Sequence, residues 1–327
     1  MVNSKALGSF LASVWWSLMT WPNPAAAQKW LPERHVEFIV PAGAGGALDT
    51  AMRTLERAVR ALNALPVSSG VVNRAGGEHA IAYTYLQQRS ADPHFLSLTA
   101  PVLLTNHISG VLPLTYTDVT PVASLMSEYF LFVVPAESRF KTAKDFVETL
   151  RQQPESVSIA GGNLVQRITI AKLLQAGEVD IKRVRVVTIS GAKTSLAVAG
   201  GHVDVGVAAP GQALTLIQSG QLRAIATSGP KRLSGSLSAV PTWSELGYEK
   251  AEFITTRGVI APKGITAAHI LFWEDVLRRA VASEEFRVAA EKNHWNAAFM
   301  NAAEYRQSLA SEYANLKRTM TFTGLVK

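Results

Sequence analysis

The sequence predicts an α/β protein whose two similar lobes face each other across a cleft. Three observations support this prediction. Short apolar segments alternate with segments of helical periodicity, which is typical of a parallel α/β sheet. The middle of the chain repeats the order of strand, small-residue loop and helix with which the chain begins. At 327 residues the chain is also longer than one hydrophobic core usually accommodates.

The first unit is built around His35–Arg53. His35–Val40 alternates and then becomes apolar like a buried strand, Pro41–Ala47 is rich in glycine, and apolar residues return at helical spacing from Leu48. A glycine loop that leads into a helix leaves peptide N–H groups unpaired at the positive end of the helix dipole. The natural partner of such a site is an anion.

Further strands and helices follow in the same order. We expect strands at Pro66–Asn73 and Phe95–Ala100, with a glycine turn at Arg74–His79 and a helix at Ala80–Arg89 between them. Ligands of parallel sheets bind at the carboxyl ends of the strands. The loops after Val40, Asn73 and Leu98 are therefore candidate parts of one site.

The middle unit begins with an apolar strand and contains two more loops of small residues. Gly161-Gly162-Asn163 follows one of its strands, and Ser190-Gly191-Ala192 follows another. The expected strands are Tyr129–Pro135, Val157–Ala160, Val184–Ile189, Val203–Ala208 and Leu222–Thr227, and the expected helices are Thr142–Gln152, Val165–Gln175, Thr194–Ala199 and 211–219.

The last part of the chain starts with a polar linker, Pro230–Pro241. One more strand is expected at Phe253–Ala261, and the remainder is interpreted as amphipathic helix over Ala267–Ala280, Glu284–Asn293 and Ala303–Met320. The apolar stripe that contains Trp273 and Val276 is expected to pack onto a sheet.

Composition excludes several classes of protein. With 48% hydrophobic and 17% charged residues the chain is a folded globular protein. The formal charge is +7, but the basic residues are scattered, so nucleic acid is not an expected partner. There are no cysteines, which excludes a thiol nucleophile, a disulfide framework and a cysteine-ligated metal.

The N-terminus has the pattern of a signal peptide. Lys5 precedes the apolar stretch Ala6–Trp21, which is followed by Pro22-Asn23-Pro24 and then Ala25-Ala26-Ala27. Residues 1–27 are therefore expected to be removed on secretion, with a periplasmic mature protein as the result. The alternative is an N-terminal membrane anchor, which the serine and threonine residues of the stretch disfavour.

At several points the chain resembles the tripartite tricarboxylate transporter receptor family, the Bug-type periplasmic solute-binding proteins. Val40–Asp49 (VPAGAGGALD) is similar to the strand, loop and helix signature of that family, and the similarity continues in the family order to the later part of the chain. The further matching fragments are Val72-Asn73-Arg74, Asp118–Val122 (DVTPV), Gly200–Asp204 (GGHVD), Ser219–Ala226 (SGQLRAIA), Val240-Pro241-Thr242 and Gly258–Gly264 (GVIAPKG).

The resemblance implies a two-lobed periplasmic-binding-protein type II fold. Each lobe would be a mostly parallel sheet flanked by helices, and two crossing strands would join the lobes. Residues 28–126 and 228–327 would form lobe 1, and residues 127–227 would form lobe 2. The cleft would close like a hinge on a small carboxylated molecule.

The resemblance also implies the residues that bind the ligand. One wall of the cleft would consist of Gly43, Ala44, Gly45, Gly46 and Asp49, extended by Thr99 and Ala100. The opposite wall would offer backbone N–H groups from Gly161, Gly162, Asn163, Ser190, Gly191 and Ala192.

The chain departs from the family pattern inside this expected pocket. Ala42 and Ala44 replace an aromatic residue and a proline, and Ala208 replaces a polar residue. Gln166-Arg167 stands where many members have a pattern like Ser-x-x-His, and an aromatic residue is missing around Ile189. These changes concern the choice of ligand and leave the expected fold unchanged.

Alternative roles remain open for several of these residues. Asp49 suits an N-terminal helix cap that accepts backbone N–H groups, and a direct contact with the ligand is the alternative. Arg167 would either bind a carboxylate in the cleft or lie solvated on a helix face. The seven histidines are dispersed and indicate no metal site, although His79 lies at a strand-end turn on the side of the cleft.

Enzymatic chemistry lacks support in the sequence. The glycine loop has Leu48 at the last position of a dinucleotide fingerprint, and Asn73-Arg74 stands where a ribose-binding acid is needed. Ser97 and Ser190 lack the Gly-x-Ser-x-Gly context of a hydrolase. We therefore expect a non-enzymatic receptor with no catalytic residue, metal or cofactor.

The expected function is the capture of a small organic acid for the membrane permease subunits of a tripartite tricarboxylate-type transporter, by a monomeric receptor. Two alternatives are kept. In the first, the closed lobes dock on a signalling membrane protein such as a sensor kinase. In the second, more remote one, the fold carries an enzyme.

Overall fold

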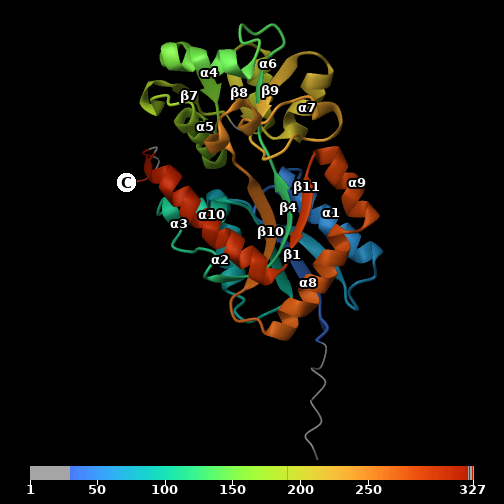
Figure 1. Ribbon diagram of the computed structural model, residues 1–327. Coiled ribbons are helices and arrows are strands. Elements are labelled where there is room, and N and C mark those ends of the chain that lie inside the picture. Colours follow the sequence, from blue (N-terminus) through green and yellow to red (C-terminus); the bar gives the residue numbers. More distant parts are fainter. Residues whose placement is uncertain (1–29, 190, 323, 325, 327) are drawn as a thin grey trace, which may run out of the picture.

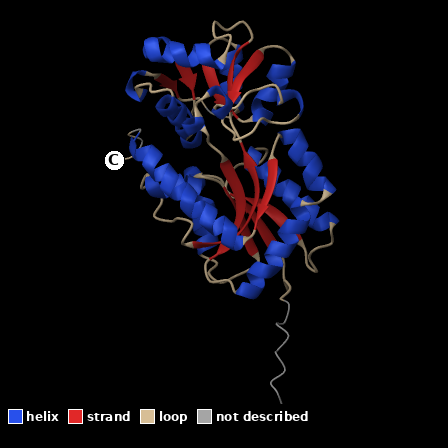
Figure 2. Ribbon diagram, viewed as in Figure 1, coloured by secondary structure: helices blue, strands red, loops and turns tan. Residues whose placement is uncertain are grey.

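Two mixed sheets, each flanked by helices, form the computed structural model, which describes residues 30–189, 191–322, 324 and 326 (Figures 1 and 2). The expected signal peptide lies outside the described residues. The six-stranded sheet has the order β11-β4-β10-β3-β1-β2. Its strands are β1 (Val36–Val40), β2 (Ser69–Asn73), β3 (Phe95–Thr99), β4 (Val119–Glu128), β10 (Thr255–Pro262) and β11 (Asn296–Met300).

Helices cover both faces of the six-stranded sheet. Successive side chains of a strand point to opposite faces, and β1 has apolar side chains on both, so both faces must be covered. Phe38 and Val40 face one helical layer, while Ile39 faces the other. The first layer contains α1 (Ala47–Ala61), α8 (Ala267–Val281) and α9 (Glu284–Asn293). The other face carries α2 (Ala80–Gln87), α3 (Val102–Ile108) and α10 (Ala302–Phe322). Trp273 and Val276 of α8 are fully buried, which confirms the packing predicted from the apolar stripe.

The five-stranded sheet has the order β7-β6-β8-β5-β9. Its strands are β5 (Leu131–Pro135), β6 (Ser158–Ala160), β7 (Arg185–Val187), β8 (Val205–Ala208) and β9 (Leu222–Thr227). The helices α4 (Ala143–Gln152) and α5 (Leu164–Ala176) pack in one cluster with this sheet, and α6 (Ala192–Ala199) and α7 (Pro210–Gln218) pack in another. The predicted α/β architecture with two sheets is confirmed.

Three elements escaped the sequence analysis. α3, β4 and β11 were not predicted, and β11 lies between the expected helices Glu284–Asn293 and Ala303–Met320, where no element was expected. The sheets are less parallel than expected, because both are mixed. β1 is parallel to β2 and β3, whereas β10 pairs antiparallel with β3 and β4, and β5 pairs antiparallel with β8 and β9.

The chain crosses between the sheets twice, at 129–130 and at 228–254. The first crossing joins β4 to β5, and the second joins β9 to β10. The two crossings lie side by side, because Glu128 pairs with Thr255 in one sheet and Leu131 pairs with Thr227 in the other. Ser228 ties them further, since its N–H group donates to the Phe130 carbonyl at 2.8 Å. We call residues 129–130 and 228–254 the crossing segments.

Candidate functional site

The strand register places the carboxyl edges of the two sheets opposite each other. In the six-stranded sheet, Thr99 ends β3 beside Gly258, close to the start of β10 at the crossing. In the five-stranded sheet, Ala208 ends β8 beside Leu131, the first residue of β5. The loops after β1 and β3 therefore project toward the loops after β6 and β8, which is the usual ligand position in open α/β sheets.

The glycine loop after β1 is exposed over Gly43–Gly46. Gly45 has a φ of +78°, in the left-handed region that favours glycine. A side chain built on Gly43 or Gly45 would meet no atom within 4 Å. α1 begins directly after the loop, at Ala47, and the first N–H groups of any α-helix lack acceptors within that helix. The loop therefore lies in open space at a helix N-terminus.

Asp49 holds this loop in shape. Its carboxylate accepts the N–H of Gly45 at 2.8 Å, Nε of Arg53 at 2.9 Å and Nδ2 of Asn73 at 2.8 Å. Asn73 Nδ2 also donates to the Ala42 carbonyl at 3.0 Å, so the end of β2 is tied to the same loop. Asp49 accepts a backbone N–H group, as expected, but it is not the N-cap: it is the third residue of α1, and the N-cap is Gly46. A direct contact of Asp49 with a ligand stays a prediction.

The environment of Asp49 keeps its carboxyl group ionised. Burial opposes ionisation, but the hydrogen bonds from Arg53, Gly45 and Asn73 outweigh that effect and hold the pKa of Asp49 below its ordinary value. The negative charge of Asp49 is thus already paired inside the protein, and it adds little repulsion toward an anion at the helix start.

On the opposite wall, the peptide donors of the second glycine loop already have acceptors. The N–H of Gly161 donates to the Val187 carbonyl at 3.0 Å. The N–H groups of Gly162 and Asn163 both donate to Oε1 of Gln166, at 3.0 and 3.2 Å. Gln166 is anchored in turn, because its Nε2 donates to the Val207 carbonyl at 2.6 Å. A ligand at this loop would have to replace Gln166 or use the side chain of Asn163.

A signal for this arrangement was present in the sequence. Asn163 and Gln166 form a capping box at the start of α5, and the Asn-x-x-Gln spacing before an apolar run is typical of that motif. The sequence analysis read the glycines as donors to a ligand and did not consider Gln166 as the acceptor.

The remaining predicted residues occupy different positions. Gly191 is the N-cap of α6 with a φ of +67°, and Ala192 is the first residue of that helix. Ser190 lies outside the described residues. Thr99 and Ala100 are buried at the end of β3, where the Thr99 hydroxyl accepts a hydrogen bond from Tyr83 at 3.5 Å.

An ion pair that the sequence analysis missed lies at the crossing. Arg257 of β10 donates to Glu128 of β4, with 2.7 Å between Nε and Oε2, and both side chains are largely buried. Glu128 and Arg257 are charged residues within strands, which is the signal by which the sequence could have revealed this pair. A buried pair of this kind is costly to break by removing one partner.

His79 lies near this ion pair in an unusual backbone conformation. Its φ is +76° and that of Glu78 is +48°, so two non-glycine residues occupy the left-handed region in succession. Nδ1 of His79 is buried without a hydrogen-bond partner in the described chain. Burial, together with the charge of Arg257, lowers the pKa of His79 to about 4, so the ring is neutral at neutral pH.

Arg167 of α5 lies at the carboxyl edge of the five-stranded sheet. Its guanidinium donates to the Thr188 hydroxyl, just past β7, at 3.3 Å. Nε of Arg167 is buried without a partner among the described residues. Arg167 is therefore a cationic donor with unused capacity at the carboxyl edge of the five-stranded sheet, and its contact with a ligand stays a prediction.

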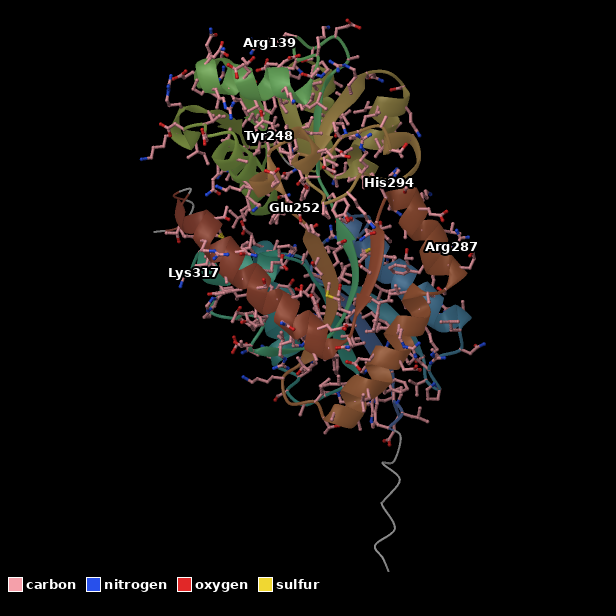
Figure 3. All side chains as sticks on the ribbon, viewed as in Figure 1. Arg139, Tyr248, Glu252, Arg287, His294 and Lys317 are labelled. Carbon is pink, nitrogen blue, oxygen red and sulfur yellow. The ribbon has the colours of Figure 1, made fainter. Side chains whose placement is uncertain are left out.

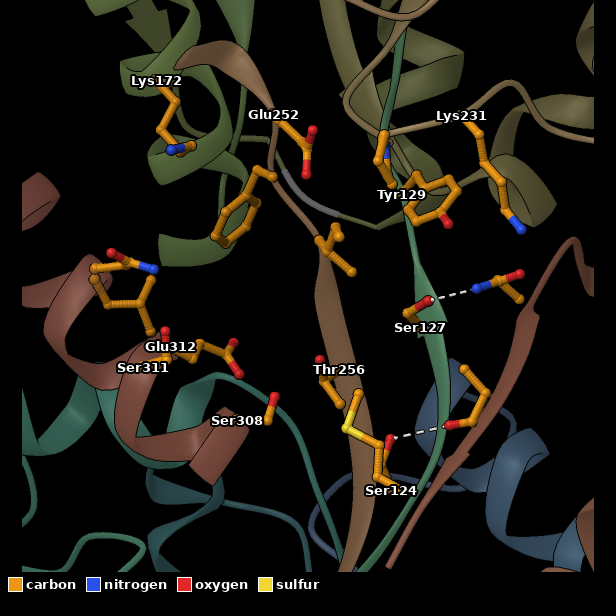
Figure 4. Close-up of a pocket in the computed structure, with 18 of the residues that line it drawn as sticks. Ser124, Ser127, Tyr129, Lys172, Lys231, Glu252, Thr256, Ser308, Ser311 and Glu312 are labelled. Atoms are coloured by element: carbon orange, nitrogen blue, oxygen red, sulfur yellow. Dashed lines mark hydrogen bonds between the residues drawn. The ribbon is translucent and has the colours of Figure 1, made fainter. Parts of the chain in front are cut away.

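A separate cavity of about 720 Å³ lies beside the crossing segments (Figure 4). It is bounded by β4, β10, β11 and α10 of one part and by α5 and the second crossing segment of the other. None of the predicted ligand-binding residues lines it. We call it the hinge cavity.

Two further observations apply to the described part of the chain. No helix there is both long enough and apolar enough to span a bilayer. The same residues contain no cluster of three or more histidine, aspartate or glutamate side chains arranged to hold a metal ion.

Comparison with known proteins identifies the family. Residues 52–325 match the tripartite tricarboxylate transporter family receptor. A relative from Cupriavidus necator, the UPF0065 protein in gbd 5'region, is 26% identical over 314 residues, which cover 95% of this chain and 93% of the relative.

Solved structures share the fold. A Rhodopseudomonas palustris protein solved with adipate is 20% identical with a TM-score of 0.77, and covers 90% of this chain and 98% of its own. The R. palustris protein MatC, solved with malate, is 20% identical with a TM-score of 0.71, covering 88% and 99%. The two-lobed fold and the resemblance seen in the sequence are confirmed, and the chain belongs to the tripartite tricarboxylate transporter receptor family.

Proposed function

We propose that this protein is a non-enzymatic receptor that binds a small organic carboxylate between its two sheets. The observation that carries the proposal is the opposition of the two carboxyl edges, with the exposed loop Gly43–Gly46 leading into α1 on one of them. A carboxylate at that loop gains N–H donors and the positive end of the helix dipole. The malate and adipate bound by the two structural neighbours make a dicarboxylate the first class to test.

Two walls of different chemistry would hold the ligand. The first is the loop from Gly43 to Gly46, kept open by Asp49 and extended by Thr99 and Ala100. On the second wall, Arg167 supplies a positive charge that a dicarboxylate can pair with. Gly191 and Ala192, at the start of α6, add peptide N–H groups there, with Ser190 beside them. Gly161, Gly162 and Asn163 complete this wall. The Asn163 side chain can bond to the ligand, and the N–H groups of Gly162 and Asn163 become available where the ligand displaces Gln166.

We further propose two lobes, with 28–126 and 228–327 as lobe 1 and 127–227 as lobe 2. Two departures from these bounds follow from the packing: Ser127 and Glu128 still pair within the six-stranded sheet, and Leu237 and Trp243 of the second crossing segment pack in the core of the five-stranded sheet. Closure about the crossing segments excludes water from the ligand, which strengthens the hydrogen bonds to its carboxylates. A ligand favours the closed form only by its greater affinity for that form. The closed, loaded receptor would deliver its acid to transporter subunits in the membrane, from a periplasmic location after loss of residues 1–27.

Binding of dicarboxylates tests the proposal directly. Malate, adipate and a panel of mono- and tricarboxylates are titrated calorimetrically against the purified protein and against Arg167→Gln. At least one acid should bind the wild type, and loss of the charge at Arg167 should weaken that binding about tenfold or more.

The matched control is Arg183→Gln, because the Arg183 side chain is exposed and paired with Glu155 before the amino ends of β6 and β7, at the edge of the sheet away from the proposed site. That variant should bind like the wild type. Absence of binding by every acid in the panel, or equal losses in the two variants, would contradict the proposed site.

A further inference from the structure

The hinge cavity has the size of a small-molecule site and walls from both sides of the crossing. Its volume of about 720 Å³ lies within the usual range of ligand pockets, roughly 300–1,000 Å³. Glu252, on the second crossing segment, lies between the parts of the molecule that contain the two sheets, and it points into the cavity (Figures 3 and 4). Lys172 enters from α5, and Glu312 enters from α10.

The floor of the cavity is polar. Ser124 and Ser127 of β4 bond to the neighbouring β11, where Ser127 Oγ accepts from Asn296 Nδ2 at 3.1 Å and Ser124 Oγ donates to the Ala298 carbonyl at 3.3 Å. Thr256 of β10 and two serines of α10, Ser308 and Ser311, add further hydroxyl groups. Hydroxyl groups can donate or accept, so this surface accommodates either end of a polar ligand.

Glu312 is the unexplained group in this cavity. Its Oε1 is buried and has no hydrogen-bond partner within the described chain. Burial raises the pKa of Glu312 to about 8, so the side chain is mostly protonated at neutral pH. A buried carboxyl oxygen without a partner costs free energy that a cation beside it would recover.

Positive charge enters the cavity from the other side of the crossing. Lys172 is partly buried, and burial lowers the pKa of its ammonium group while Glu252 acts in the opposite direction. Lys231 also lines the cavity, on the second crossing segment. The remaining titratable lining group is Tyr129, and the buried Tyr305 lies close enough to Glu312 for their charges to interact.

We propose that the hinge cavity is a second ligand site and that its ligand is a zwitterionic amino acid. The ammonium group of the ligand pairs with Glu312 among the hydroxyl groups of Ser308 and Ser311, and its carboxylate faces Lys172. This site is independent of the glycine loop and of the proposed carboxylate site. A ligand there touches α5, α10 and the crossing segment together.

The proposal is tested with three ω-amino acids of increasing length: glycine, 4-aminobutanoate and 6-aminohexanoate. Pentylamine and hexanoate serve as probes, because each is 6-aminohexanoate with one of its two charged groups removed. At least one amino acid should bind with a Kd below about 1 mM, and the matching amine should bind more weakly. Because Glu312 is neutral before binding and charged afterwards, calorimetry near neutral pH in buffers of different ionisation enthalpy should show release of close to one proton per ligand.

Two substitutions separate this site from the carboxylate site. Glu312→Gln is nearly isosteric with the protonated side chain, so the variant should fold, and it should lose amino-acid binding at least tenfold while binding dicarboxylates normally. Lys172→Gln should reduce the affinity for the amino acid to that of the amine. Glu304→Gln, an exposed change on the same helix, is the control and should change nothing.

Three results would overturn the proposal. One is failure of all three amino acids to bind at millimolar concentration. Another is binding that Glu312→Gln leaves intact, and the third is binding without proton release. Failure of the carboxylate panel with amino-acid binding intact would contradict the proposed function alone.

Discussion

Asp49 acts through the loop that it holds rather than through its charge alone. Asp49→Ala removes the acceptor of the Gly45 N–H and of Asn73 Nδ2. We expect the free energy of unfolding to fall by about 2 kcal/mol, since hydrogen bonds to a charged acceptor are lost and the loop loses one of its links to β2. Arg53→Gln should cost less than about 1 kcal/mol, because the Arg53 side chain is largely exposed. Urea unfolding measures both values, and equal costs would show that the ion pair matters more than the loop.

Glu312 makes stability depend on pH. Its pKa rises from an ordinary 4.5 to about 8 in the folded protein. Between these values the native state holds a proton that the unfolded chain has lost, so the free energy of unfolding falls as the pH rises, by up to about 1.4 kcal/mol per pH unit.

The variant Glu312→Gln should lack this dependence. Relative to the wild type, it should therefore gain stability steadily from pH 5 to pH 8. Urea titrations across that range provide the measurement. Stability curves that run parallel in the two proteins would refute a buried, protonated Glu312.

At the scale of elements, the strands that carry the candidate site, β1 and β3, were predictable from the sequence, whereas β4 and β11 were not. β1 (VEFIV) and β3 (FLSLT) are mostly apolar, and the glycine loop and the helical spacing of α1 can be read directly from the sequence. β4 contains Pro121, which argues against a strand. Its pairing with β10 also shifts register twice, opposite Arg257/Gly258 and Val259/Ile260 of β10, which breaks the alternation along β4. β11 is short, contains alanine and asparagine, and takes its place through pairing with β4, a tertiary contact that no local pattern reveals.

The docking of α10 on β10 depends on a glycine. A Cβ on Gly258 would lie 2.4–2.5 Å from the ring of Tyr305, which is fully buried. Gly258→Ala should lower the free energy of unfolding by roughly 1–3 kcal/mol through overpacking. Gly211→Ala is the control, since its nearest neighbour would lie 3.9 Å away. Thermal unfolding compares the two, and a Gly258→Ala midpoint equal to that of the control would mean that Tyr305 moves aside without cost.

At the scale of the whole molecule, apolar contacts already hold the two parts together on one side. Val165 and Ile168 of α5 pack in one buried cluster with Leu104 of α3 and Leu309 of α10, across the boundary between the sheets. The sequence predicts α5 as an apolar helix. It does not reveal that one face of α5 packs on the five-stranded sheet and another on α10, because the α10 partners of Ile168 lie more than a hundred residues away. This cluster favours the observed arrangement of the two parts without any ligand. If closure of the cleft uses the same contacts, they raise its apparent affinity.

Ile168→Ala should shift the molecule toward an open form. The substitution removes buried contacts that exist only while the lobes meet, so the unliganded protein should have a larger radius of gyration in solution scattering and a weaker affinity for its carboxylate. Ile170→Ala on the same helix is the matched control, because Ile170 is buried within the core of the five-stranded sheet.

The control should lose stability by about 1–4 kcal/mol with its radius of gyration unchanged. Equal radii in the two variants would place Ile168 in the ordinary core and remove the argument that α5 restrains opening. A larger radius in Ile168→Ala alone, reversed by saturating ligand, would show that packing and ligand binding act on the same equilibrium between open and closed lobes.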